Sequence, residues 1–117
     1  MPSPNAITLQ LIDPQTVTIL SGQSISNNLS LYGTTASGLI TPAGLTGTAI
    51  IFQASVDGIN FYPLYDKTGN PINIVVDTSA RAYPFFPADF FPWRYIRLES
   101  NASEASDRNF TVALQAI

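Results

Sequence analysis

Hydrophobic and polar residues alternate with a period of two along most of the chain. Phe110, Val112 and Leu114 are spaced two residues apart, and Ile96 and Leu98 have the same spacing. Such alternation places successive side chains on opposite faces of a β-strand, so that one face is buried and the other is wetter. No window has the 3.6-residue period of a capped helix of ten or more residues. The pattern therefore predicts antiparallel β-sheets.

Turn residues separate the alternating runs, with seven glycines and nine prolines at strand-sized intervals. Val56–Phe61 predicts a β-hairpin around Asp57-Gly58. Pro87–Phe91 predicts a single helical turn before the next proline. The predicted strands lie near Ile7–Ile12, Thr16–Leu20, Ser24–Tyr32, Ala49–Val56, Phe61–Tyr65, Ile72–Val76, Ala82–Phe86, Trp93–Ser100 and Asn109–Gln115.

Eight or nine short strands without helices predict an all-β fold, either an antiparallel β-sandwich or a closed barrel. The connection Thr34–Thr48 is rich in Gly, Thr and Ala, and we expect it to cross between the sheets. No linker, repeat or charge block divides the 117 residues, so we expect one domain over residues 1–117. Residues 1–6 are the candidate for an extended N-terminal arm.

Charged residues make up 11% of the chain, less than half of the usual share of about 25%. The surface must therefore be largely uncharged, which is typical of a protein that works within an assembly. The net charge is −3, and the five basic residues form no stripe that could follow phosphates, so nucleic acid is not an expected partner. No stretch reaches the roughly 18–20 apolar residues of a membrane span, and we expect no membrane partner.

The residue types that most enzymes need are scarce. Histidine and cysteine are absent, which excludes most pairs of nucleophile and base. Most of the eight acidic residues lie beside turn residues, where Asp caps the backbone, so a hydrolase with two carboxylates is a weak alternative. We expect no enzymatic activity and no cofactor. A calcium site in the loops is an open alternative, and its candidate ligands are Asp57, Asn60, Asp66 and Asn70.

Tyr83–Trp93 is the most unusual segment, because it holds four of the seven Phe and the only Trp. Two interpretations explain the rings: they fill one end of the core, or they form a stiff exposed loop that anchors a protein partner or stacks on sugar rings. Six aromatic residues so close together cannot all point inward, so both interpretations stay open. The candidate partner-interface residues are Phe85, Phe86, Phe90, Phe91 and Trp93, with Pro2 and Pro4 of the arm.

Several runs of the chain resemble small structural proteins of tailed phages. These runs are Ser21–Ser26, Leu39–Pro42, Ala49–Asp66, Gly69-Asn70, Trp93–Leu98 and Asp107–Val112. The resemblance implies a jelly-roll β-sandwich on the virion surface, where a head decoration or cement protein stabilises the capsid shell. It implies the major capsid protein or another virion protein as partner. We expect a homotrimer if the protein sits on threefold positions of the shell.

The same strand-hairpin-strand run is also similar to carbohydrate-binding sandwiches. The alternative function is therefore a carbohydrate-binding or host-attachment module on a head fibre or tail, with a glycan as its ligand. Neither resemblance implies any catalytic residue.

Overall fold

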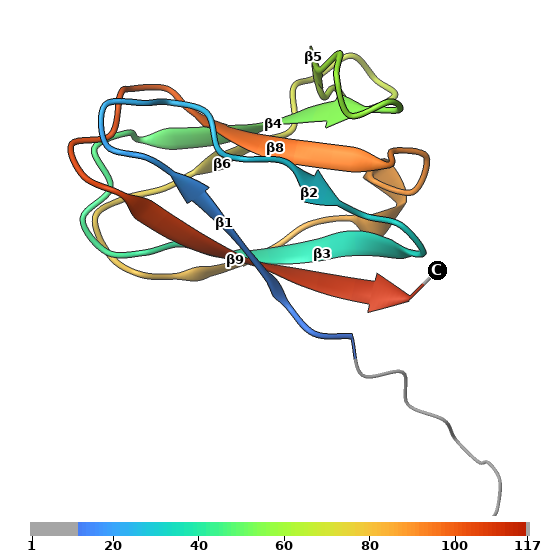
Figure 1. Ribbon diagram of the computed structural model, residues 1–117, viewed down its shortest axis with the longest axis horizontal. Coiled ribbons are helices and arrows are strands. Elements are labelled where there is room, and N and C mark those ends of the chain that lie inside the picture. The colour runs from blue at the N-terminus through green and yellow to red at the C-terminus, as the bar shows by residue number, and fades with distance from the viewer. Residues whose placement is uncertain (1–11, 117) are drawn as a thin grey trace, which may run out of the picture.

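Two packed antiparallel β-sheets form the fold in the computed structural model, which describes residues 12–116 (Figure 1). The strands are β1 (Gln15–Ile19), β2 (Leu29–Ser30), β3 (Thr34–Ile40), β4 (Ala49–Ser55), β5 (Tyr62–Pro63), β6 (Asn73–Val75), β7 (Ala82–Pro84), β8 (Tyr95–Ser100) and β9 (Arg108–Ala116). A short 3₁₀ turn, η1 (Pro87–Asp89), lies between β7 and β8. The predicted all-β sandwich is confirmed, and among the described residues no helix is long and apolar enough to cross a membrane.

The strand order is that of a jelly roll. One sheet has the order β1-β9-β3-β7, and the other has the order β2-β8-β4, with β5 and β6 both paired to β4. The pairs β1·β9, β2·β8, β3·β7 and β4·β6 are nested in the sequence, and successive pairs alternate between the two sheets. The chain therefore behaves as one long antiparallel hairpin that is folded over on itself, as in jelly-roll proteins.

One strand lies where a connection was expected. β3 occupies the first half of residues 34–48, so the prediction that this whole segment is a crossover is wrong; only residues 41–48 pass between the sheets. Leu39 of β3 is buried in the core. At Gly38 an added Cβ would lie 3.2 Å from the Tyr83 carbonyl oxygen, so glycine permits the close pairing of β3 with β7.

The other predicted strands agree with the structure in position, although their ends differ. Within the predicted strand Ser24–Tyr32, only the two residues of β2 form a strand in the structure. The hairpin is confirmed, since β4 and β5 pair across residues 56–61, and the helical turn is confirmed as η1. The predicted strand Ile7–Ile12 and the arm 1–6 lie outside the described residues, except for Ile12.

Strand register determines which loops meet. Ser55, the last residue of β4, pairs with Tyr95, the first of β8, and Ser30 of β2 pairs with the same residue. One end of the sandwich therefore carries residues 31–33, 56–72 and 85–94, which we call the aromatic end. The opposite end carries residues 20–28, 41–48, 76–81 and 101–107, which we call the polar end. The two ends lie on the right and on the left of Figure 1.

Candidate functional site

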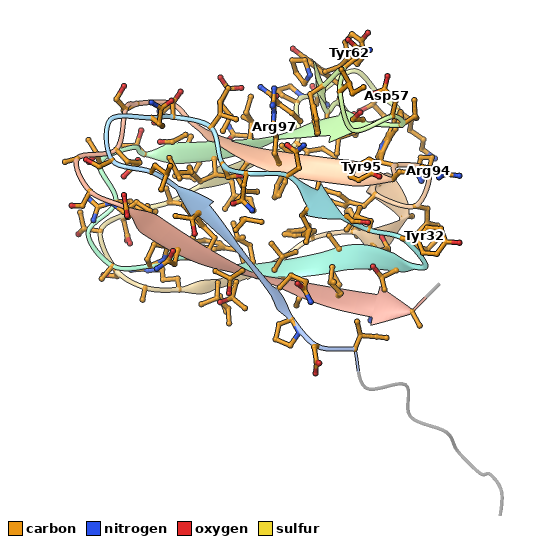
Figure 2. All side chains as sticks on the ribbon, viewed as in Figure 1. Tyr32, Asp57, Tyr62, Arg94, Tyr95 and Arg97 are labelled. Atoms are coloured by element: carbon orange, nitrogen blue, oxygen red, sulfur yellow. The ribbon has the colours of Figure 1, made fainter. Side chains whose placement is uncertain are left out.

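Exposed apolar side chains are concentrated at the aromatic end. Ten large hydrophobic side chains are exposed among the described residues, and three of them, Leu20, Ile40 and Val75, lie elsewhere. The seven at the aromatic end are Tyr32, Val56, Ile59, Tyr62, Tyr65, Phe86 and Phe91. Figure 2 shows Tyr32 and Tyr62 at this end of the sandwich, together with Arg94. Isolated exposed apolar residues are normal, so the gathering of seven at one end makes this end the candidate binding surface.

The Tyr83–Trp93 segment divides between core and surface, so both interpretations of it hold in part. Phe90 has no exposed surface, and its ring lies 5.1 Å from Phe52 and 4.8 Å from Phe85. Phe86 is 77% exposed and Phe91 is 49% exposed. Two rings of this segment are therefore available to a partner.

Phe90 belongs to the core, so its prediction as an interface residue is wrong. Its backbone N–H donates to the Pro87 carbonyl oxygen at 2.9 Å and closes η1, and its side chain joins the buried cluster. Phe85 and Trp93 are partly buried against the same cluster. Pro2 and Pro4 lie outside the described residues.

A rigid turn displays Ile59, which is 82% exposed. The Asp57 carboxylate accepts hydrogen bonds from the backbone N–H of Asn60 and of Ile59, both at 2.8 Å, and from the Ser55 hydroxyl at 2.9 Å. These bonds, those of Asn60 above all, hold the pKa of Asp57 well below its usual range. Gly58 takes the left-handed conformation that the turn requires, with φ at +79°.

A second turn of the same kind is built on Asp66. Its Oδ1 accepts hydrogen bonds from the Thr68 hydroxyl at 2.7 Å, from the Thr68 N–H at 2.9 Å and from the Asn70 N–H at 3.0 Å. The Thr68 hydroxyl contributes most to lowering the pKa of Asp66. The four candidate calcium ligands thus serve two separate turns, and residues 12–116 contain no group of three or more acidic side chains placed to hold a metal ion.

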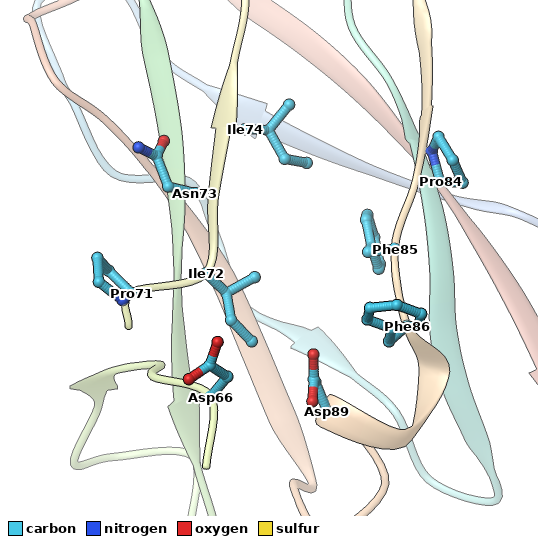
Figure 3. A pocket seen from close by; sticks show the side chains of 9 residues that line it. All are labelled: Asp66, Pro71, Ile72, Asn73, Ile74, Pro84, Phe85, Phe86 and Asp89. Atoms are coloured by element: carbon cyan, nitrogen blue, oxygen red, sulfur yellow. The ribbon is translucent and has the colours of Figure 1, made fainter. Parts of the chain in front are cut away.

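A cleft of about 440 Å³ lies between the edge strands β6 and β7 and borders the aromatic end (Figure 3). It is lined by Asp66, Pro71, Ile72, Asn73, Ile74, Pro84, Phe85, Phe86 and Asp89. In the described sheets, β6 pairs only with β4 and β7 only with β3, so each strand has one edge without a partner. Figure 3 shows the carboxylates of Asp66 and Asp89 at one end of the cleft, and the rings of Phe85 and Phe86 along one wall.

The polar end is held together by Glu104, which is only 1% exposed. Its carboxylate accepts hydrogen bonds from the N–H groups of Thr46 and Gly47, from the Ser100 hydroxyl and from Arg108 Nε, all at 2.8–2.9 Å. Burial acts to raise the pKa of Glu104, but these four bonds outweigh it, so the pKa lies below its ordinary value. A Cβ at position 47 would collide with the Ser100 hydroxyl, so the loop needs glycine there.

The sequence analysis did not identify the exposed residues outside Tyr83–Trp93. A signal was present for Tyr32 and Ile59, because each large apolar residue stands next to a turn glycine, Gly33 or Gly58. A large apolar side chain in a tight turn has little core within reach. The burial of Glu104 could not be predicted, because nothing in the sequence pattern distinguishes this residue from the other acidic residues in loops.

Comparison with known proteins assigns no family to the chain. No family model matches it, and no curated protein is significantly similar to it in sequence. The evidence for its function is therefore the chemistry of its own surface.

Proposed function

We propose that this chain is a structural binding protein that docks through its aromatic end onto another protein of a phage particle. The observation that carries the proposal is the collection of seven exposed large apolar side chains at one end of the sandwich. Covering this patch would remove apolar surface from water, which is the main driving force of protein association. In the proposed role the chain decorates the capsid surface and stabilises the shell.

The composition of the aromatic end supports a protein partner. Tyr, Phe and Arg are enriched at the centres of protein interfaces, and this end presents Tyr32, Tyr62, Phe86, Phe91 and Arg94. The turns on Asp57 and Asp66 hold their loops in fixed positions, so little ordering entropy is lost on binding. Jelly rolls are frequent in viral capsid proteins, which supports the proposal by analogy of fold.

We propose a binding role rather than catalysis because Glu104 and Asp57, the carboxylates with the most hydrogen bonds, have structural roles. Glu104 is saturated by four hydrogen bonds, and Asp57 anchors its own turn. The chain contains neither His nor Cys, the residues that most often supply the general base or the nucleophile of an enzyme.

Carbohydrate binding is the second candidate, and the exposed rings favour it. Tyr32 is 82% exposed and Tyr62 is 67% exposed, so each presents a face on which a sugar ring could stack. A glycan array separates the two functions. Binding of a defined glycan that is lost in Tyr32→Ser and Tyr62→Ser would favour the carbohydrate function over the protein partner.

The proposed function is tested by sedimentation of the purified chain with phage particles stripped of it. The test variant carries Tyr32→Ser and Phe91→Ser, and the matched control carries Leu20→Ser and Val75→Ser, which remove two exposed apolar side chains away from the aromatic end. We expect the test variant to bind at least tenfold more weakly, because buried aromatic residues dominate interface energies. Equal binding by the test variant and the natural chain would contradict the proposal.

The cement role and the predicted trimer are tested separately. Counting copies on purified particles should give a number in proportion to the capsid subunits, and a few copies per particle would contradict the cement role. Light scattering after size exclusion should give the mass of a trimer. A trimer that the aromatic-end variant dissociates would place this end between copies of the chain and contradict docking on the capsid.

A further inference from the structure

The cleft between β6 and β7 combines apolar walls with negative charge. None of its nine lining residues is basic. The ion pairs among residues 12–116 are Asp77–Arg81 and Glu104–Arg108, so neither Asp66 nor Asp89 has a cationic partner in the described chain. Two carboxylates beside apolar walls leave the cleft complementary to a positive charge.

Both carboxylates have oxygen atoms that can accept further hydrogen bonds. The bonds that Asp66 receives from Thr68 and Asn70 all end on its Oδ1, which leaves Oδ2 free within the described structure. No hydrogen bond from residues 12–116 reaches the Asp89 carboxylate. Figure 3 shows the two carboxylates at the same end of the cleft, one on each side of it.

The apolar wall suits a cation that has an apolar stem. Phe86 is 77% exposed and lies next to Phe85, and Ile72 lies opposite them in the cleft. Lysine and arginine pack their methylene groups against apolar surface, and their charged groups are attracted to the faces of aromatic rings. The chain already contains this arrangement elsewhere, since the Arg97 guanidinium lies 4.2 Å over the Phe61 ring.

We propose that the cleft receives one arginine or lysine side chain of the protein that docks on the aromatic end, with its charged group between Asp66 and Asp89 and its stem against Ile72 and Phe86. This inference rests on the proposed function, because the cleft borders the docking surface. A saccharide fits the lining less well, since sugar hydroxyl groups need donors as well as acceptors, and Asn73 is the one side-chain donor among the nine residues.

The test is a titration of the full chain, followed by NMR, with N-acetyl-arginine methylamide at millimolar concentrations. The uncharged analogue N-acetyl-citrulline methylamide has nearly the same shape and serves as the control ligand. We expect saturable shifts of the backbone amides of Ile72, Asn73 and Phe86 with the arginine compound and none with citrulline. Equal shifts with both compounds, or no saturable shift with arginine, would overturn the inference, as would saturable shifts with galactose or glucose alone.

Two variants show whether binding uses the cleft. Asp89→Asn should weaken binding of the arginine compound roughly tenfold, because a charge-assisted hydrogen bond is lost. Asp77→Asn removes one negative charge at the polar end and should leave binding unchanged. Spectra that superimpose outside the cleft show that both variants fold, and equal weakening by both variants would contradict a specific site.

The two proposals can fail separately. If the arginine compound does not bind but the Tyr32→Ser and Phe91→Ser variant still loses particle binding, only the cleft inference fails. If the arginine compound binds in the cleft but that variant binds particles normally, the docking proposal fails instead.

Discussion

The two ends of this sandwich differ in which atoms they bury. At the polar end a carboxylate, Glu104, is withdrawn from water and surrounded by four donors. At the aromatic end Tyr32, Ile59 and Phe86 are left in water. A buried charge and an exposed apolar patch are both exceptions to ordinary burial, so each needs a cause. In the proposed account, the polar end serves stability and the aromatic end serves binding.

The largest expected effect on stability distinguishes a buried phenylalanine of the aromatic end from an exposed one nearby. Phe90→Ala should lower the free energy of unfolding by about 4 kcal/mol, because it leaves a cavity beside Phe52 and Phe85. Phe86→Ala, four residues away, should change it by less than about 0.5 kcal/mol, because its ring is exposed. Urea denaturation followed by tryptophan fluorescence measures both, and similar losses would contradict the division of the segment into core and surface.

The second largest expected effect on stability concerns Glu104 at the polar end. Glu104→Ala should lower the free energy of unfolding by about 3 kcal/mol, because Arg108 and two backbone N–H groups lose their buried acceptor. The matched control is Asp77→Ala, which breaks the exposed ion pair with Arg81 at the same end and should cost less than about 1 kcal/mol. If the two variants were equally stable, the buried carboxylate would not be what holds these loops.

Stability should also depend on pH in a direction set by Glu104. Its pKa is lower in the folded chain than the ordinary value of about 4.5, so the unfolded chain binds the proton more readily. The contribution is complete above pH 4.5 and is lost as the pH falls toward the folded pKa. Urea midpoints between neutral pH and about pH 3 should fall more steeply for the natural chain than for Glu104→Gln. Parallel curves would show that another carboxylate controls acid unfolding.

The smallest effect concerns the exposed turn. Ile59→Ser should leave the free energy of unfolding within about 0.5 kcal/mol of the natural value, because the side chain is 82% exposed and the turn is held by Asp57. A marked loss of stability, measured by thermal unfolding, would mean that Ile59 packs in solution and does not belong to a binding surface.

The fold could be predicted largely because burial follows the period of two. Ile96 and Leu98 are each 1% exposed, as their alternation indicates. β3 could not be recognised in this way, since Gly38 and the Thr and Ala residues around it resemble a loop. This strand is determined by its neighbours β9 and β7, which pair with it from both sides, and such context is not visible in a local window.

The candidate site could be predicted only in part. The Tyr83–Trp93 segment was identified from its composition, but the direction of each ring depends on η1, which turns Phe90 inward and leaves Phe86 outside. The cleft joins Asp66 to Asp89, which are distant in sequence and meet because β6 and β7 are the edges of two packed sheets. Long-range pairing of this kind cannot be deduced from alternation alone.

The most direct test of the docking surface is hydroxyl-radical footprinting of the chain, free and bound to phage particles, with mass spectrometry of each side chain. We expect binding to protect Tyr32, Tyr62 and Phe91 at the aromatic end, while Leu20 at the polar end remains as reactive as in the free chain. Protection of Leu20 with unchanged labelling of the three aromatic residues would contradict the assignment of binding to the aromatic end.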